Sequence, residues 1–386
     1  MEGDRENRRL ATVHVKMLYD ALMHSLQRAE EEVLMTIDET KLNKVIGQVI
    51  KDIGATFHAP LVLIGEKLGL FKAMAGAGLI TARELAERTG TFERYVGEWL
   101  PAMAAGGYVE YDKESGTYFL TPEQAFAFAD ETSAGYMAGA FQAATAAIRS
   151  EAKIADAFRT GKGVGWHEHD PELYIGAERF YKPNYVAHLV SSWIPALDGV
   201  EQKLKDGARV ADVGCGYGVS TILMAQAFPH SRFFGFDYHE LSIQWARKRA
   251  EEGGVSDRVT FETVSAKDMP GVRYDLITMF DCLHDMGDPV GVARHMREAI
   301  KDDGTWMIVE PFAEDRVEDN FNPVGRLFYC ASVLLCTAGA IEQEGHMVLG
   351  GQAGEKRIRE IVTAGGFTRF RRAAQTPINL IFEARP

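Results

Sequence analysis

Hydrophobic residues recur at helical spacing in residues 1–56. Leu18, Leu22 and Leu26 follow one another four positions apart, and the pattern resumes at Leu42. Apolar residues three or four positions apart share one face of a helix, so we expect two amphipathic helices here. Their apolar stripe either holds a second subunit or covers the next domain.

Residues 57–130 combine a helical pattern with two short alternating runs. Thr81 and Glu84 have the spacing of a capping box, which opens one of three expected helices. The alternating runs flank a turn that ends at Gly116, which predicts a hairpin. Three helices and a hairpin are typical of a winged helix. Its presumed recognition helix and wing carry more acidic than basic residues, so we expect the module to pack, dimerise or cover a substrate pocket rather than read DNA.

The pattern changes again after the hairpin. Residues 131–200 are rich in alanine and aromatic residues and predict a helical bridge. Short β-branched runs then alternate with amphipathic helices through residues 201–386, with an antiparallel edge strand expected at Asn379–Ala384. This alternation predicts an α/β domain with a doubly wound, Rossmann-like sheet. The expected parts are N-terminal helices at 1–56, a winged helix at 57–130, the bridge at 131–200 and the sheet domain at 201–386.

Composition and charge narrow the range of partners. The chain has 42 lysines and arginines against 55 aspartates and glutamates, and a formal net charge of -13 argues against a nucleic-acid partner. The four cysteines show neither a CxxC pair nor a disulfide framework, which predicts free thiols in a reducing compartment. We find no signal-peptide pattern and no run near the roughly 18 apolar residues of a membrane span, and therefore expect a cytoplasmic protein with no membrane partner.

A glycine-rich turn follows the first strand of the sheet domain. The run Arg209–Val213 leads directly into Gly214–Gly218, and a helix follows. Glycines let the backbone turn tightly and let a ligand approach without a Cβ in the way. Asp237 ends the next strand and is placed to accept the hydroxyls of a ribose. The expected cofactor-binding residues are therefore Gly214, Cys215, Gly216, Gly218 and Asp237.

This spacing does not by itself separate a nicotinamide cofactor from S-adenosylmethionine. The glycine pattern is GxGxG preceded by Asp212, whereas GxGxxG opens a helix onto a pyrophosphate. S-adenosylmethionine has no pyrophosphate, but its ammonium group needs an acceptor, which Asp212 provides directly or through water. The pattern favours S-adenosylmethionine, with an NAD-dependent oxidoreductase as the alternative among enzymes.

From Ala208 to Glu310 the chain resembles the class I S-adenosylmethionine-dependent methyltransferases. Asp212–Gly218 resembles their glycine-rich first motif, and Asp237 resembles their ribose-binding acid. The resemblance implies that Asp268 receives the adenine amino group and that Met269 packs on the ring. With its winged helix, the chain resembles the small-molecule O-methyltransferases of plants and bacteria, and more closely the mycobacterial-type group. Further cofactor-binding residues expected from the resemblance are Tyr238, Lys267 and Phe280.

The resemblance implies transfer of a methyl group from S-adenosylmethionine to a small organic acceptor. The methylated atom is an oxygen, or alternatively a nitrogen or a sulfur. The expected partners are the acceptor and a second copy of the chain in a homodimer. A different class of protein remains as the alternative, namely a winged-helix transcription regulator that senses S-adenosylmethionine. Such a regulator needs a basic recognition helix.

The residues at the expected catalytic position differ from the plant-type pattern. Those enzymes carry a histidine base after the fourth strand, and Val290 occupies that position here. Glu310, which matches the acid that orients the base, is retained. His284 is the nearest titratable group and could accept a proton near neutral pH. We therefore treat His284 and Glu310 as catalytic candidates, with a purely structural role for His284 as the alternative.

Signals for the acceptor pocket are weaker. Tyr181 and His188 lie where related enzymes place a helix over the methyl group, although core packing explains them equally well. Tyr329 and His346 lie in the long insertion after the fifth strand. The alternating histidines within residues 166–170 suit an exposed loop better than a chelate, so no metal site is expected.

Overall fold

The computed structural model describes residues 23–25 and 37–386 of the chain, and these form two compact units divided between His58 and Ala59. Leu18, Leu22 and Leu26 lie outside the described residues. The expected second helix is observed as α2 (Glu39–Lys67), which runs past the expected boundary at residue 56 and contains Pro60. The helix ends instead just before Gly69, whose φ of 70° lies in the left-handed region that favours glycine.

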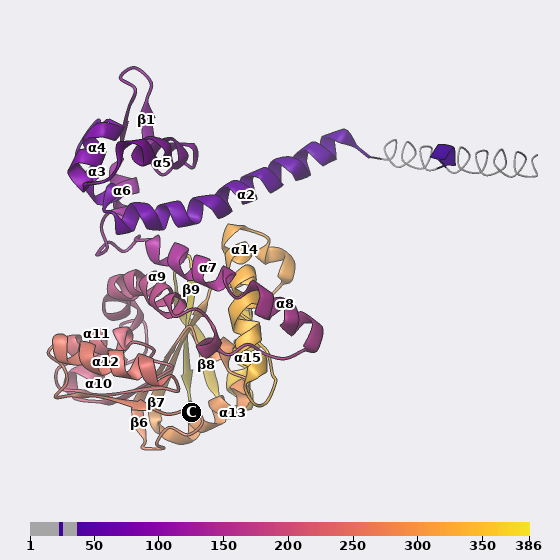
Figure 1. Ribbon diagram of the computed structural model, residues 1–386. Coiled ribbons are helices and arrows are strands. Elements are labelled where there is room, and N and C mark those ends of the chain that lie inside the picture. Colours follow the sequence, from indigo (N-terminus) through magenta and orange to yellow (C-terminus); the bar gives the residue numbers. More distant parts are fainter. Residues whose placement is uncertain (1–22, 26–36) are drawn as a thin grey trace, which may run out of the picture. The chain divides into compact units, whose positions relative to one another are not determined.

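The predicted winged helix is present. Its helices are α3 (Leu70–Met74), α4 (Ala82–Thr89) and α5 (Glu93–Ala105), and its antiparallel hairpin is β1 (Glu110–Asp112) with β2 (Thr117–Phe119) (Figure 1). The expected capping box opens α4, because Thr81 and Glu84 bond each other reciprocally. Trp99 anchors the core, and its indole N–H donates to the carbonyl of Leu61 at 2.9 Å.

The bridge is helical as predicted. It contains α7 (Ala138–Ile148), α8 (Glu151–Thr160), η1 (Trp166–Glu168), α9 (Glu172–His188) and η2 (Leu189–Trp193), with α6 (Pro122–Phe128) before it and α10 (Val200–Asp206) at its end. Helices α7 and α9 lie close together because glycines stand at their contact. A Cβ on Gly139 would lie 2.5 Å from the backbone of Arg179, and one on Gly176 would overlap the backbone of Ala143. This contact holds α9 in place, and α9 faces the site described below.

The sheet domain contains a seven-stranded sheet in the order β5-β4-β3-β6-β7-β9-β8. Its strands are β3 (Arg209–Val213), β4 (Arg232–Asp237), β5 (Val259–Thr263), β6 (Tyr274–Phe280), β7 (Ile300–Pro311), β8 (Arg369–Gln375) and β9 (Asn379–Arg385). The first five strands in this order pair in parallel, which confirms the doubly wound α/β prediction. The prediction of a C-terminal edge strand was wrong in position. Strand β9 is antiparallel, but it lies between β7 and β8, because β8 forms a hairpin with it and takes the edge.

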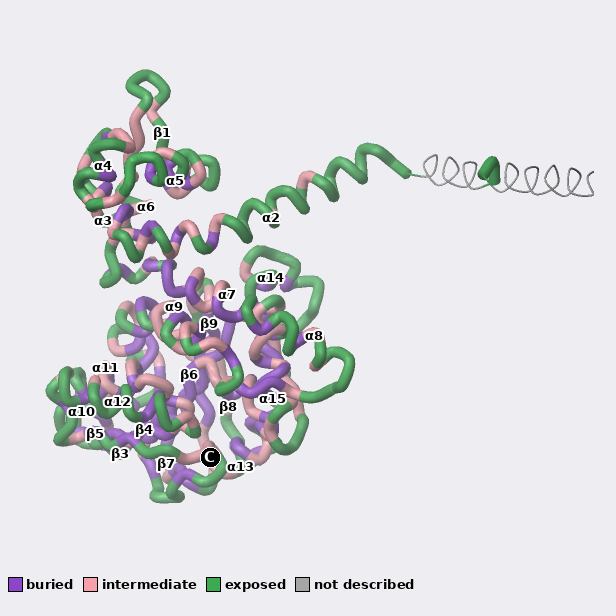
Figure 2. The backbone as a smooth tube through the Cα atoms, in the orientation of Figure 1, coloured by how far each residue is buried: buried purple, intermediate pink, exposed green. Residues whose placement is uncertain are grey.

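Helices cover both faces of the sheet. Helices α11 (Val219–Ala227) and α12 (Glu240–Glu252) pack on one face, and α13 (Pro289–Ala299) and α16 (Gly354–Ala364) pack on the other. Between β7 and α16 the chain also forms η4 (Val317–Asn320), α14 (Pro323–Ala331), η5 (Ser332–Cys336) and α15 (Thr337–Glu342). Successive strand residues enter different hydrophobic clusters, as Val210 and Ala211 do, because side chains alternate across a strand. Figure 2 shows the resulting buried strands inside largely exposed helices.

Among the described residues, one helical run is long and apolar enough to cross a membrane. The run Pro323–Glu342 has 20 residues and a mean hydropathy of 1.6, and 33% of the scored window is buried. The expectation that no run would approach this length was wrong. It considered unbroken apolar residues, whereas this run passes on its mean hydropathy although small and polar residues interrupt it. Such a run is weak evidence for a membrane span, since helices of folded domains pass the same test. Here Phe328 and Cys336 are buried within the fold.

Candidate cofactor and active site

A cavity of about 570 Å³ opens where the carboxyl ends of β3, β4 and β6 meet. Ligands bind open α/β sheets at this end, beside the point where the strand order reverses. The volume lies within the roughly 300–1,000 Å³ of small-molecule sites. Its walls come from the turns after these strands, the loop after β5, helix α9, and Glu342 and Gln343 at the end of α15.

The glycine turn is built from left-handed residues, with φ of 73° at Gly214, 51° at Gly216 and 78° at Gly218. A Cβ on Gly214 would lie 2.7 Å from the sulfur of Cys282, and one on Gly218 would lie 2.6 Å from the ring of Phe261. Gly214, Cys215 and Gly216 line the cavity, whereas Gly218 caps α11 behind it. Glycine is therefore needed both for conformation and for close packing.

Asp237, at the end of β4, stabilises this turn through hydrogen bonds. One carboxylate oxygen accepts the backbone N–H of Gly216 at 2.9 Å, and the other accepts that of His239 at 2.9 Å. Burial raises the pKa of the Asp237 carboxyl, although these two hydrogen bonds act to lower it. Asp237 also lines the cavity, so its free lone pairs can accept ligand hydroxyls.

Asp212 stands behind the turn and does not line the cavity. Its side chain is buried and accepts hydroxyl hydrogens from Ser220 at 2.7 Å, Thr221 at 2.5 Å and Thr278 at 2.9 Å. Burial raises the pKa of this carboxyl, while the hydroxyls act to lower it. The arrangement ties β3 to α11 and β6, which is a positioning role. The geometry gives no direct path from this carboxylate to a ligand ammonium group.

The loop after β5 reaches the cavity through earlier residues than expected. Val264, Ser265 and Ala266 line the wall, whereas Lys267 and Asp268 are exposed outside it. Met269 is buried in the core next to the cavity wall, and its carbonyl accepts the His295 ring N–H at 2.9 Å. Asp268 accepts the hydroxyl hydrogen of Ser265 at 2.6 Å. A motif alignment cannot supply the path of this loop.

The other expected contacts divide into two groups. Tyr238, Phe280 and Tyr181 line the cavity. His188, Tyr329 and His346 do not. The ring of His188 stacks at 6.1 Å from Trp193, and the ring of His346 bonds the carbonyl of Ile341 at 3.0 Å, while Tyr329 is half-buried on α14. Tyr181 is therefore the candidate acceptor residue that the fold brings to the site.

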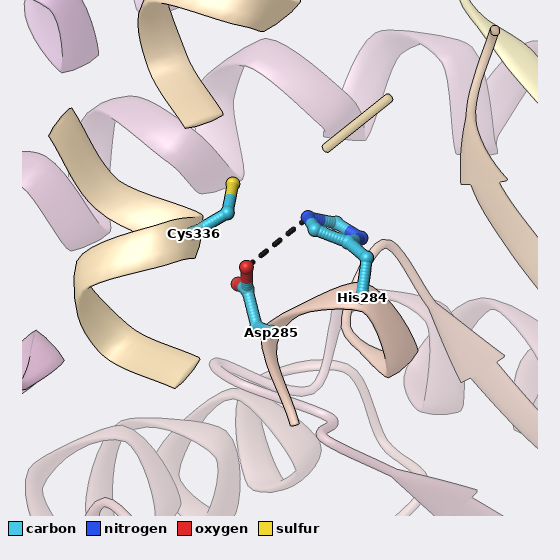
Figure 3. Close-up of side chains that lie close together, drawn as sticks. All are labelled: His284, Asp285 and Cys336. Atoms are coloured by element: carbon cyan, nitrogen blue, oxygen red, sulfur yellow. Dashed lines mark ion pairs between the residues drawn. The ribbon is translucent and has the colours of Figure 1, made fainter. Parts of the chain in front are cut away.

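His284 is buried between two carboxylates. Its Nδ1 lies 2.6 Å from Glu310. Its Nε2 lies 3.2 Å from Asp285, the ion pair drawn in Figure 3. Burial lowers the pKa of His284, but Asp285 and Glu310 outweigh it and hold that pKa well above the usual value. The ring is therefore an imidazolium that donates from Nδ1 to Glu310 and forms an ion pair with Asp285 through Nε2. It does not line the cavity, whereas Asp285 does.

Cys336 completes a close group with these residues. The ligand-type atoms of His284, Asp285 and Cys336 all lie within 4.8 Å of one another, the single such trio among the described residues. Figure 3 shows Cys336 extending from its helix toward the turn that carries the other two. The Nδ1 of His284 is bonded to Glu310 and its Nε2 is paired with Asp285, so the trio is part of a buried ion-pair network.

Sequence reasoning missed Asp281, which follows β6 immediately and lines the cavity. Its φ of 50° is left-handed, which is uncommon for a residue other than glycine. The Tyr185 hydroxyl donates to one carboxylate oxygen at 2.8 Å, and the Asn379 amide donates to the other at 2.7 Å. The position at a strand's carboxyl end was the available signal. Its partners, from α9 and β9, are far away in the sequence.

The lining is acidic and aromatic. Among the described residues, the cavity is lined by no lysine or arginine. Its carboxylates are Glu178, Asp237, Asp281, Asp285 and Glu342, and its large aromatic residues are Trp166, Tyr174, Tyr181, Tyr185, Tyr217, Phe236, Tyr238 and Phe280. Such a site favours ligands that carry positive charge and flat apolar groups.

Two curated relatives are similar to part of this chain. The Ubiquinone biosynthesis O-methyltransferase of Bordetella avium is 32% identical over 155 residues, which are 39% of this chain and 58% of that protein. The 27-O-demethylrifamycin SV methyltransferase of Amycolatopsis mediterranei is 32% identical over 103 residues, which are 26% and 38% of the two chains. The chain thus spans less than two thirds of the length of these curated relatives.

Solved structures share the fold over most of the chain. A putative O-methyltransferase of Nostoc punctiforme has a TM-score of 0.68 at 18% identity, covering 88% of this chain and 98% of that one. The mitomycin 7-O-methyltransferase MmcR has a TM-score of 0.65 at 19% identity, covering 90% and 100%. Human N-acetylserotonin methyltransferase, solved with S-adenosylmethionine, has a TM-score of 0.64 at 16% identity, covering 88% and 97%.

Two protein families match the chain itself. Residues 57–129 match the Rv2258c-like winged HTH domain, and residues 204–366 match the Methyltransferase domain. These matches agree with the resemblance drawn from the glycine turn, Asp237 and the hairpin. The chain is therefore built from an Rv2258c-like winged-helix domain followed by a methyltransferase domain.

Proposed function

We propose that this protein transfers a methyl group from S-adenosylmethionine to a small organic acceptor. The observation that carries the proposal is one cavity in which the glycine turn and Asp237 form one wall and Asp281 lies in the turn after the neighbouring strand. The match to the methyltransferase domain family supports it. A cavity of about 570 Å³ leaves room for an acceptor beside the cofactor.

The residues of the cavity fit S-adenosylmethionine better than a nicotinamide dinucleotide. Asp237 would accept the ribose hydroxyls, and Tyr238 and Ala266 would flank the adenine, while the acidic lining suits a sulfonium and an ammonium group. A pyrophosphate would instead meet carboxylates with no lysine or arginine to pair with. The alternative of an oxidoreductase is disfavoured on this ground. When bound, S-adenosylmethionine supplies an electrophilic methyl group, and the protein aligns an acceptor with it and excludes water.

We assign the acceptor end to Trp166, Tyr181 and Tyr185 together with Asp281 and Asp285, all of which line the cavity. When ionised, which for Asp281 requires a pH near or above its pKa of about 8, these buried carboxyls repel an anionic acceptor, because like charges in a poorly solvated site cost several kcal/mol. We therefore propose a neutral or cationic acceptor with an aromatic or other flat apolar body. Acceptors whose carboxylate would stand near these residues are excluded by the same argument.

Three catechols that differ in one substituent test this proposal. 4-Methylcatechol is neutral, dopamine is cationic and protocatechuate is anionic, while the reactive ring is the same. At pH 8.5, where Asp281 is largely ionised, and with S-adenosylmethionine present, release of S-adenosylhomocysteine should give a kcat/KM for the anionic acceptor at least tenfold below that of the other two. A preference for protocatechuate would contradict the acidic acceptor site.

We also propose that the protein forms a homodimer through α2, whose apolar stripe is exposed. The stripe consists of Leu42, Val45, Ile46, Val49, Ile50 and Ile53, each more than 40% exposed. A contiguous apolar face of this kind is costly in water and is typical of a helix that binds another helix. A second copy of the chain offers the same stripe, as a symmetric interface requires.

Light scattering during gel filtration tests the dimer. Ile46→Asp places a charge at the centre of the stripe and should shift the mass from two chains to one. Lys51→Asp makes the same new carboxylate on the opposite side of α2, where Lys51 is exposed, and should leave two chains together. A wild-type mass of one chain, or equal behaviour of both variants, would refute the proposed interface.

We further propose that the winged helix does not read DNA and that the protein is cytoplasmic. The solvent face of α5 supports the first statement, because Arg94 is engaged by Glu98 at 2.5 Å and cannot offer an unopposed charge to phosphate. The regulator alternative therefore lacks its basic helix. All four cysteines lie within the described residues as free thiols, which supports a reducing compartment.

A further inference from the structure

Asp281 is held at the cavity by partners from separate elements. Besides accepting from Tyr185 on α9 and Asn379 on β9, its backbone N–H donates to the carbonyl of Val309 on β7 at 2.7 Å. Asn379 is itself fixed, because its amide oxygen accepts from Asn184 at 2.6 Å. The carboxylate of Asp281 therefore has a set position at the end of β6.

The backbone of Asp281 is strained, and this strain is maintained by the fold. Left-handed φ values are unfavourable for a residue with a Cβ, and they persist where the surroundings fix them. Here the neighbouring Cys282 donates its thiol hydrogen to the carbonyl of Val213 at 3.2 Å, and a Cβ on Gly214 would touch its sulfur. The segment that carries Asp281 therefore lies directly against the glycine turn.

Burial and a nearby carboxylate raise the pKa of the Asp281 carboxyl. Burial raises its pKa to about 8, and the nearby Glu310 carboxylate adds to this effect. His284 and the hydrogen bonds from Tyr185 and Asn379 act in the opposite direction. A carboxyl group of this kind can be ionised before the reaction and protonated after it near neutral pH. Neither the binding of the ribose nor the support of the glycine turn uses it.

We propose that Asp281 is the proton acceptor of the methyl-transfer site, an inference that rests on the proposed function. The lone pair of an acceptor oxygen or nitrogen forms the bond to the methyl carbon, and the pair of the carbon–sulfur bond remains on sulfur, which becomes a neutral thioether. The proton leaves the acceptor O–H or N–H and binds a carboxylate oxygen of Asp281. Tyr185 and Asn379 are positioning residues that orient this carboxylate.

This assignment replaces His284 as the base candidate. His284 is already protonated between Asp285 and Glu310, and its ring does not reach the cavity. Asp281 does line the cavity, and it lies beside Tyr181 and Tyr185 on α9. It therefore meets the geometric requirement for a base, which is access to the proton that it removes.

Two ligands that differ at the reacting atom test the placement of Asp281 without an acceptor. Sinefungin carries an amine where the methyl group of S-adenosylmethionine stands, whereas S-adenosylhomocysteine carries nothing there. The Asp281→Asn variant keeps the shape of the side chain, and asparagine tolerates a left-handed φ better than most residues. Its amide oxygen can accept from Asn379 and its N–H can donate to the Tyr185 oxygen, so the fold should be preserved.

Calorimetric titration at pH 8 should show that the wild type has a higher affinity for sinefungin than for S-adenosylhomocysteine. Asp281→Asn should lower the affinity for sinefungin at least tenfold and leave that for S-adenosylhomocysteine within threefold, because a charge-assisted hydrogen bond to the amine is lost. Asp268→Asn removes a carboxylate that is exposed outside the cavity and should change the ratio of the two affinities less than threefold.

The outcomes separate the two proposals. If Asp281→Asn weakens both ligands equally, or neither, Asp281 does not face the reacting atom and the inference is overturned. The same holds if Asp268→Asn changes the ratio as much as Asp281→Asn does. If the wild type binds neither ligand, the proposed function itself fails, and the assignment of Asp281 fails with it.

Discussion

Replacing Asp237 with alanine is expected to weaken the binding of S-adenosylhomocysteine at least tenfold. The variant removes a carboxylate that lines the cavity and would accept both ribose hydroxyls, each bond being worth about 1.5–3 kcal/mol. It also leaves the N–H groups of Gly216 and His239 without their acceptor, which loosens the glycine turn. Both effects act in the same direction, and calorimetry at constant pH measures their sum.

Asp268→Ala is the matched control for this variant. The resemblance assigns Asp268 to the adenine, but its side chain is exposed and lies outside the cavity. We expect its affinity to stay within threefold of the wild type. Unchanged affinity in a folded Asp237→Ala protein would refute the assignment of the ribose contact. An equal loss in both variants would show that the loop after β5 closes onto the ligand.

Replacing His284 with alanine is expected to lower the free energy of unfolding by about 3–5 kcal/mol, which is the usual cost of breaking a buried ion pair. The variant leaves Asp285 and Glu310 facing each other without the cation between them. Chemical denaturation at pH 7 measures the loss. His188→Ala is the control, because His188 stacks on Trp193 without an ion-pair partner there and should cost about 1 kcal/mol.

The effect of His284 should also depend on pH in one direction. Its pKa is raised by folding, so its charged form stabilises the native state fully below the unfolded pKa of about 6.5. This contribution is lost as the pH rises through the higher folded pKa. The difference in stability between the wild type and His284→Ala should therefore shrink at alkaline pH. A difference that grows with pH, or a variant as stable as the wild type, would contradict the imidazolium between two carboxylates.

The parts of the site that could be predicted are those whose signal is local in the sequence. Gly214 and Gly216 follow a strand directly, and Asp237 ends the next one, so strand, turn and acid can be recognised without knowing any distant contact. Parallel strands then bring these ends together at one edge of the sheet. The winged helix was predictable for the same reason, since its capping box and hairpin are short-range patterns.

The parts that could not be predicted depend on contacts between distant segments. The hydrogen bond to Glu310 on β7 turns the His284 ring toward the core rather than the cavity. The sequence around His284 does not indicate this direction. Asp281 acquires its role from Tyr185 and Asn379, which lie on α9 and β9. The position of Asp268 depends on the path of a loop. A resemblance supplies a motif, but side-chain direction comes from packing.

The most direct test of the central claim is a native mass spectrum of the full chain after incubation with an equimolar mixture of S-adenosylhomocysteine and NADH. We predict one bound S-adenosylhomocysteine per chain and no bound NADH, because the acidic cavity suits the first ligand and has no lysine or arginine for a pyrophosphate. Bound NADH, or neither ligand bound, would contradict the account.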